Sequence, residues 1–275
     1  LIMSEVAVLC RQAGDAIMKI YADKESWHVQ QKADTSPVTE ADLEANQILI
    51  EGLSHLTPDI PVLSEEGREI PWEHRSEWQR YWLIDPLDGT KEFIAGNAEF
   101  TVNVALIENG QAILGVVVAP AFGITFKGAL GLGAFKREGE GETQAIHCRP
   151  LNKDIRLLAS RRHGLEKLNN LKEKLQQEFD TVTQNSLGSS LKICEIAQGQ
   201  ADIYARFGPT SEWDTAAGHA VLTAAGGHLI DHQGLPLVYN QKESLLNPEF
   251  FVIGAEELRW KSLICDEILA LDNDC

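Results

Sequence analysis

Two aspartates three residues apart end an apolar run in the segment WLIDPLDGTKEF, residues 82–93. Pro86 restricts Asp85 to extended backbone, and the turn that follows can bring Asp88 beside it. The carbonyl of Leu87 can face the same point. Carboxylate and carbonyl oxygens are the ligands that hard cations such as Mg²⁺ prefer. The spacing therefore predicts a cation site in this segment.

Two other acidic segments can complete such a site, namely Ser64-Glu65-Glu66 and Trp213-Asp214. Four carboxylates in one small space would repel each other strongly without bound cations. Gly89 and Thr90 can form a phosphate-binding site, because a helix that begins near Thr90 leaves backbone amides that can bind an anion. The Thr90 hydroxyl can also orient a water whose pKa a metal lowers.

Each of these pieces also has an ordinary structural explanation. Residues 211–214 resemble a helix capping box, residues 39–42 read as another helix cap, Asp88-Gly89 is usually a turn, and Glu65-Glu66 alone is most often a solvated pair. Their joint occurrence is much less probable by coincidence than any one of them. The joint pattern therefore favours a metal site.

The elements that must position these residues can be read from apolar spacing. Apolar residues from Val6 to Ile20 recur at helical spacing and predict a helix over 3–22, and a second helix begins after Thr39 and ends near Gly52. Residues 28–32 favour a strand of a hairpin. From Trp82 onward strands dominate, and Asn109-Gly110 between two apolar runs predicts a hairpin turn.

The polar stretch 136–150 predicts a crossing between two halves, residues 1–150 and 151–275. After it, strand-like runs (155–159, 181–184, 201–204) alternate with helix-like runs (165–178, 187–197, 211–225), which is the order of an α/β layer. The first half is expected to carry most metal ligands. The second half is expected to carry Asp214 and the residues that select the substrate.

Composition excludes several classes of protein. The chain has 275 residues and a formal charge of −17, which disfavours binding to nucleic acid or to an anionic membrane surface. Five cysteines without a CxxC pair suggest neither a disulfide framework nor a zinc site. The cysteine pattern fits a reducing cytoplasm best. No apolar stretch reaches the length of a membrane span, so we expect a soluble protein, with peripheral attachment to the inner membrane left open. Leu1 and Ile2 precede Met3, so the natural start is expected at Met3.

The quoted motifs resemble those of the inositol monophosphatase superfamily of Mg²⁺-dependent, Li⁺-sensitive phosphatases. The resemblance covers SEEG, WLIDPLDGTKEF, residues 185–227 and ESLLNPEFFV, which together span most of the chain. Within the superfamily the 3'(2'),5'-bisphosphate nucleotidases are the most similar branch. The resemblance implies an α/β (α+β) fold, the layered α/β/α/β/α sandwich shared with fructose-1,6-bisphosphatase, with the metal site between the two halves.

The resemblance also implies roles for the metal ligands. Glu65, Asp85 and the Leu87 carbonyl would hold one Mg²⁺, while Asp85, Asp88 and Asp214 would hold a second, and two or three ions are expected in all. The resemblance implies that a phosphate monoester would then be hydrolysed by a metal-activated water without a covalent intermediate.

Four residues are implied to act on that water and on the scissile phosphate. Asp42 would pair with Thr90 to activate the water, with Glu65 sharing the task, and Gly89 and Thr90 would contact the phosphate. The implied reaction is removal of the 3'-phosphate from adenosine 3',5'-bisphosphate (PAP) to give AMP, with conversion of the sulfated nucleotide PAPS to APS left open.

The choice of substrate depends on departures from the inositol enzymes. Arg206 stands where those enzymes typically have a glutamate, and Lys192 stands where they usually have a neutral residue. The start of a helix at Gly188-Ser189-Ser190 offers further amides. A substrate with a second phosphate suits these changes. Together with the residues that the resemblance implies, the substrate-binding residues expected are Glu65, Leu87, Asp88, Gly89, Thr90, Gly188, Ser189, Lys192, Arg206 and Asp214.

Alternatives remain at this stage. Arg206 can instead form a surface salt bridge, and Lys192 can lie on a solvated helix face. The segment Ser160-Arg161-Arg162-His163 follows a strand and is a weaker candidate contact for the nucleoside, since Arg162 departs from the serine or threonine common in the subfamily. Other possible functions are an inositol or sugar monophosphate phosphatase, and a catalytically silent nucleotide-binding regulator. Oligomeric state is left open.

Overall fold

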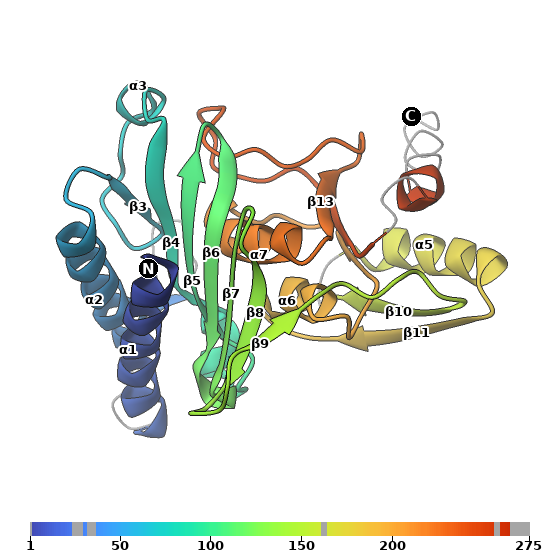
Figure 1. Ribbon diagram of the computed structural model, residues 1–275, viewed down its shortest axis with the longest axis horizontal. Coiled ribbons are helices and arrows are strands. Elements are labelled where there is room, and N and C mark those ends of the chain that lie inside the picture. The colour runs from blue at the N-terminus through green and yellow to red at the C-terminus, as the bar shows by residue number, and fades with distance from the viewer. Residues whose placement is uncertain (1, 24–29, 32–36, 161–163, 256–258, 265–275) are drawn as a thin grey trace.

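A computed structural model describes residues 2–23, 30–31, 37–160, 164–255 and 259–264. Its elements form five layers, in which helices and sheets alternate across the molecule (Figure 1). The layered α/β/α/β/α sandwich expected from the sequence is confirmed. Within the described residues, no helix has the length and apolar character needed to cross a membrane.

The outer helical layer consists of α1 (Ile2–Ala22) and α2 (Glu40–Leu56), which cover one face of the larger sheet (Figure 1). The prediction of a helix over 3–22 is confirmed. The prediction that the second helix ends near Gly52 is wrong, because the helix continues to Leu56. A Cβ at Gly52 would lie 2.5 Å from a methyl carbon of Leu9, so this glycine permits the close packing of α1 on α2.

A short hairpin joins these two helices. Strand β1 (Gln30–Gln31) pairs antiparallel with β2 (Pro37–Val38). The predicted strand over 28–32 is confirmed at Gln30 and Gln31, and its other positions lie outside the described residues.

The larger sheet has seven strands in chain order. Its strands are β3 (Val62–Ser64), β4 (Arg80–Asp88), β5 (Thr101–Glu108), β6 (Gln111–Ala119), β7 (Ile124–Ala129), β8 (Gly133–Glu138) and β9 (Gln144–Ile146). Among the described strands of this sheet, only β3 and β4 pair in parallel. Asn109 and Gly110 have φ of 50° and 78°, so the predicted hairpin turn is confirmed. Three short helices, α3 (Trp72–Arg75), α4 (Thr90–Ile94) and η2 (Pro120–Phe122), lie in the connections.

The prediction that all of 136–150 is a crossing segment is wrong in part. Strand β8 continues to Glu138, and β9 forms the edge of the sheet over 144–146. An edge strand has few buried positions, and in β9 only Ile146 is buried. The strand therefore lacks the apolar pattern that identifies strands in a sequence. The connection to the second sheet follows after Ile146.

The smaller sheet has the strand order β11-β10-β12-β14-β13. Its strands are β10 (Asp154–Ala159), β11 (Thr181–Ser186), β12 (Ile203–Arg206), β13 (His228–Asp231) and β14 (Phe250–Ile253). Helix α5 (Leu165–Glu178) packs on its outer face through Leu168, Leu171 and Leu175. The predicted alternation of strands and helices is confirmed.

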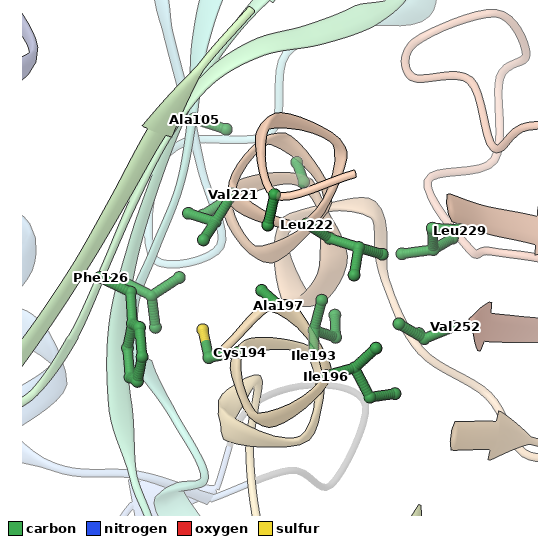
Figure 2. Close-up of a cluster of buried hydrophobic side chains, with 14 of the residues drawn as sticks. Ala105, Phe126, Ile193, Cys194, Ile196, Ala197, Val221, Leu222, Leu229 and Val252 are labelled. Atoms are coloured by element: carbon green, nitrogen blue, oxygen red, sulfur yellow. The ribbon is translucent and has the colours of Figure 1, made fainter. Parts of the chain in front are cut away.

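Helices α6 (Leu191–Ala197) and α7 (Glu212–Ala224) form the layer between the two sheets. Figure 2 shows Val221 and Leu222 of α7 between Phe126 of the larger sheet and Val252 of the smaller one. Helix α7 thus follows residue 150 in the chain but packs on both sheets. The division into 1–150 and 151–275 as separate units stays a prediction.

Replacing Gly115 with alanine is expected to destabilise this central layer. A Cβ at Gly115 would lie 2.1 Å from the carbonyl oxygen of Ala217 in α7, so β6 and α7 must separate. We expect the free energy of unfolding to fall by at least about 1–3 kcal/mol, the usual cost of overpacking. Urea denaturation measures the loss. Gly254→Ala is the control, because its Cβ would meet no atom closer than 3.6 Å; equal losses would contradict the explanation.

Candidate metal and phosphate site

Three carboxylates converge where β4 ends and α7 begins. Oxygen atoms of Asp85, Asp88 and Asp214 lie within 4.8 Å of one another. Strand β4 bulges between Asp85 and Asp88, because these residues pair with Asn103 and Thr101, which are only two positions apart. The bulge and the start of α7 therefore bring together the aspartates that the sequence pattern selected. We call these three residues the carboxylate cluster.

The environment of the carboxylate cluster disfavours three negative charges. Burial, followed by the charges of neighbouring carboxylates, raises the pKa of Asp85 well above its usual range. Burial raises the pKa of Asp88 to about 6, although the charge of Lys192 opposes this rise. Burial and the charge of Asp88 raise the pKa of Asp214 to about 8. Hard oxygen donors under mutual repulsion fit a site for divalent cations.

Glu65 lies beside this cluster, immediately after β3. Its backbone amide donates to the carbonyl of Ile84 at 3.2 Å, which places it next to β4. Its side chain forms a hydrogen bond with Asp85 that contributes to the raised pKa of that residue. All four predicted side-chain ligands, Glu65, Asp85, Asp88 and Asp214, therefore lie close together.

Thr90 and Asp42 form the hydrogen-bonded pair that the resemblance implied. The Thr90 hydroxyl lies 3.0 Å from Asp42 Oδ1 and 3.3 Å from the carbonyl of Leu87. The amide and the hydroxyl of Thr39 both donate to Asp42 Oδ2, at 2.7 and 2.5 Å. Asp42 therefore caps α2 and also faces Thr90, so the cap and the site are not alternatives. Burial raises the pKa of Asp42, and the Thr39 hydrogen bonds oppose that rise.

Gly89 gives the turn into α4 its shape. It has φ of 96°, in the left-handed region, and its Cβ would lie 3.1 Å from the carbonyl oxygen of Glu99. Helix α4 begins at Thr90, as predicted.

A pocket of about 210 Å³ opens beside the carboxylate cluster. Its charged lining consists of the acidic residues Asp88, Glu92 and Asp214 and the basic residues Lys91, Lys192 and Arg206. The pocket thus brings three basic side chains next to the residues expected to hold metal ions. Its lining also includes Gly89, Ser160, Gly188 and Ser189.

Lys192 does not lie on a solvated helix face. Only 5% of the residue is exposed, and its ammonium donates to the carbonyls of Leu187 and Ser189 at 2.9 and 2.8 Å. It also lies 5.1 Å from the ring centre of Tyr204. Burial lowers the pKa of Lys192 to about 8, and the charge of Asp88 opposes this shift. Lys192 therefore shapes the loop before α6 as well as lining the pocket.

Arg206 is held by neutral acceptors. Its guanidinium donates to Ser160 Oγ at 2.9 Å and to the carbonyls of Gly208 and Pro209 at 3.2 and 3.0 Å. These bonds use three of the five N–H groups and fix the plane of the guanidinium at the pocket wall. The alternative of a surface salt bridge finds no support among the ion pairs of the described residues.

The prediction that α6 begins at Gly188 is wrong. Ser189 has φ of 49°, which interrupts helical backbone, and the helix begins at Leu191. The amide of Gly188 donates to Glu99 Oε2, and the amide of Ser190 donates to Asp88 Oδ2, both at 2.6 Å. These two amides therefore join the halves of the chain through carboxylates.

Some contacts of the site carry no sequence signal. Neither the Glu99 bond to Gly188 nor the position of Tyr204 under Lys192 follows from a motif or a spacing, because each joins segments far apart in the chain. Of the candidate segment 160–163, only Ser160 is described, and it accepts the Arg206 hydrogen bond. Arg161, Arg162 and His163 lie outside the described residues.

Comparison with known proteins gives a consistent result. The sequence pattern of the inositol monophosphatase family matches residues 3–266. The 3'(2'),5'-bisphosphate nucleotidase CysQ of Escherichia coli K12 is 52% identical over 250 residues, which cover 91% of this chain and 98% of the relative. CysQ of Haemophilus influenzae is 35% identical and covers 95% and 96% of the two chains.

Solved structures show the same fold. CysQ from Bacteroides thetaiotaomicron, a bacterial member of the inositol monophosphatase family, superposes with a TM-score of 0.78 at 38% identity, covering 91% of this chain and 96% of that one. An inositol monophosphatase of Thermotoga maritima superposes with a TM-score of 0.73 at 25% identity, covering 96% of both. The similarity thus extends over nearly the whole of each chain.

Proposed function

The chain belongs to the inositol monophosphatase family, and from that membership we propose that it is a Mg²⁺-dependent 3'(2'),5'-bisphosphate nucleotidase that hydrolyses the 3'-phosphate of PAP. The observation that carries the choice of substrate is the pocket in which Lys192 and Arg206 lie beside the carboxylate cluster. One phosphate of the substrate can bind at the carboxylate cluster while the second binds at Lys192 and Arg206. The names of the CysQ relatives agree with this substrate class.

The carboxylate cluster, with Glu65 and the Leu87 carbonyl, would hold two or three Mg²⁺ ions. The fit rests on the close approach of three carboxylates whose pKa values burial raises. When bound, Mg²⁺ neutralises phosphate oxygens, lowers the pKa of water and stabilises the leaving oxygen. Asp85, Asp88 and Asp214 thereby contribute mainly through their charge.

Thr90 and Asp42 would orient the attacking water. When the Thr90 hydroxyl donates its single proton to Asp42, its lone pairs remain to accept a hydrogen bond from water. The two Thr39 bonds hold the Asp42 carboxylate in the orientation that this requires. Glu65, beside Asp85, would share the task of accepting the proton of the water.

Replacing Arg206 with glutamine tests the substrate assignment. A charge-assisted hydrogen bond contributes roughly 1.5 to 3 kcal/mol, so its loss should lower kcat/KM for PAP at least ~10-fold. Hydrolysis of 3'-AMP, which has one phosphate, should fall much less, because the cluster and Thr90 are unchanged. Glutamine is preferred to glutamate because glutamate would add a negative charge at a position whose charge acts on Asp214.

The measurement is the ratio of kcat/KM for PAP to that for 3'-AMP. Arg156→Gln is a matched control on the same sheet, since Arg156 does not line the pocket. An unchanged ratio in Arg206→Gln would mean that Arg206 does not read the second phosphate. A wild-type preference for inositol 1-phosphate or fructose 1,6-bisphosphate would favour the sugar phosphatase alternative, and absence of turnover would favour the regulatory one. PAPS belongs in the same panel.

The proposal includes a cytoplasmic location. Cys10, Cys148 and Cys194 are free thiols, which suits a reducing compartment. Attachment to the inner membrane, left open from the sequence, has no support among the described residues. The partner proposed is the small-molecule substrate.

A further inference from the structure

Glu212 is a buried carboxylate at the first position of α7, two residues before Asp214. Residues two apart on an α-helix project about 200° from each other, so Glu212 points away from the side of α7 that carries Asp214. Only 1% of Glu212 is exposed, and its Oε2 accepts a hydrogen bond from the backbone amide of Asn240 at 2.8 Å. Within the described part of the chain its Oε1 has no hydrogen-bond partner, and Lys242 Nζ lies 3.8 Å away.

Asn240 connects this carboxylate to the first half of the chain. Its side chain accepts from Arg75 Nη1 at 2.6 Å and donates to the Arg75 carbonyl at 2.5 Å. Arg75 in turn donates to the carbonyls of Lys242 and Glu243 and lies over the ring of Trp72. Arg75 and Asn240 are both buried. A continuous series of hydrogen bonds therefore runs from α3 to the first turn of α7.

Stability alone does not explain why this position is a glutamate. A buried carboxylate with one oxygen that accepts no hydrogen bond and has only a long ion pair, to Lys242, is costly, and apolar residues of similar size are often at least as stable in such places. The same helical turn carries Asp214, which must be held close to Asp85 and Asp88 against their mutual repulsion. A rigid attachment on the opposite side of the helix supplies that restraint.

We propose that Arg75, Asn240 and Glu212 form a clamp, named here the α7 clamp, that positions Asp214 in the carboxylate cluster and so sets the affinity for the cation that Asp214 helps to hold. This inference rests on the proposed function, because it requires that the cluster binds Mg²⁺. These three residues touch neither the substrate pocket nor the cluster and are positioning residues.

Other bonds keep α7 in place when the clamp is opened. The Glu212 amide donates to the Leu245 carbonyl at 2.8 Å, and the Asn247 side chain donates to the Ser211 carbonyl at 2.7 Å. Removing the Glu212 side chain therefore leaves the helix attached through its backbone. The substitution removes only the side-chain restraint on the orientation of the first turn of α7.

The test compares Mg²⁺ binding in Glu212→Ala and Glu212→Gln. Mg²⁺ affinity, measured by calorimetry on protein freed of metal, should fall about 10-fold or more in Glu212→Ala, the usual effect of removing a group that orients a metal ligand. The Mg²⁺ concentration for half-maximal activity should rise by the same factor, whereas kcat at saturating Mg²⁺ should change little. Glu212→Gln retains an oxygen that can accept from Asn240, so its affinity should stay close to that of wild type.

Asp202→Asn is the matched control. Asp202 is also buried and paired with a basic residue, Arg149, but its partners Arg149 and Arg156 do not belong to α7. It should lower the melting temperature without changing Mg²⁺ affinity. If Glu212→Ala behaves like this control, the clamp is merely structural and the inference is overturned. An equally large loss in Glu212→Gln would overturn it in favour of an effect of charge.

Two further outcomes are separable from these. If Glu212→Ala does not fold, Glu212→Asp takes its place, because the shorter side chain keeps the charge but loses its reach to Asn240; wild-type Mg²⁺ affinity there overturns the clamp. If the wild-type protein binds no Mg²⁺, the proposed function fails first, and the clamp, which requires that binding, is overturned with it. Wild-type binding together with unchanged affinity in the Glu212 variants defeats the clamp alone.

Discussion

Asp88→Asn is expected to lower kcat for PAP by about 100-fold or more, the scale of a lost electrostatic contributor to a transition state. Asparagine keeps the size of the side chain, and its carbonyl oxygen can still accept the bond from the Ser190 amide. The substitution therefore removes one charge from the carboxylate cluster and leaves the local contacts in place. The measurement is kcat at saturating Mg²⁺ and substrate.

The same variant should not destabilise the protein in the absence of metal. Burial raises the pKa of Asp88 from 3.8 to about 6, so at neutral pH the charge of Asp88 costs the metal-free folded protein free energy relative to the unfolded chain, and asparagine removes this cost. Thermal unfolding in chelator checks this expectation. Asp180→Asn, at an exposed carboxylate paired with Lys153, is the control. It should change neither kcat for PAP nor the melting temperature in chelator. Near-normal kcat in Asp88→Asn would show that this aspartate only shapes a turn.

Removing divalent cations should abolish turnover and make stability depend on pH. The folded protein holds a proton at Asp214 more tightly than the unfolded chain does, because burial and the charge of Asp88 raise the pKa from 3.8 to about 8. The resulting stabilisation is complete below about pH 4, the pKa of an unperturbed aspartate, and is lost as pH rises through 8. The melting temperature of the metal-free protein should therefore fall by several degrees between pH 5 and pH 8.

Mg²⁺ should reverse this loss, since it takes the place of the protons. The rise in melting temperature on adding Mg²⁺ is therefore expected to be larger at pH 8 than at pH 5. Asp214→Asn should flatten the pH dependence of the metal-free protein. A metal-free protein whose stability is constant or increases over this range, or turnover that survives thorough chelation, would contradict the assignment of the cluster as a cation site.

The sequence was sufficient for those parts of the site that depend on local backbone. Pro86 and Gly89 restrict the backbone on either side of Leu87. The motif itself therefore determines the bulge that brings Asp85 and Asp88 together. The helix starts at Thr39 and Ser211 were equally visible, because capping residues have characteristic spacing. What the pattern could not show is that a cap and a site residue can be the same side chain, as Asp42 is.

Contacts between distant segments could not be predicted. Gly52 looked like a helix end because glycine usually weakens helices, yet its role is to admit Leu9 of α1. For Lys192 a solvated helix face stayed open as an alternative to substrate binding, because its partners are backbone carbonyls, which have no sequence signature. Arg206 was recognised through its departure from a family pattern, whereas the three acceptors that fix its orientation became visible only in three dimensions.

The position of α7 between the sheets has a consequence for synthesis of the chain. Strand β9 ends the larger sheet at Ile146, but α7, which covers the inner face of that sheet, begins only at Glu212. A ribosome must therefore translate the intervening segment while the apolar face around Val117 and Phe126 has no cover from this helix. Chaperones can bind this face of the nascent chain during the interval, and polypeptides that terminate within it would present the same face for aggregation.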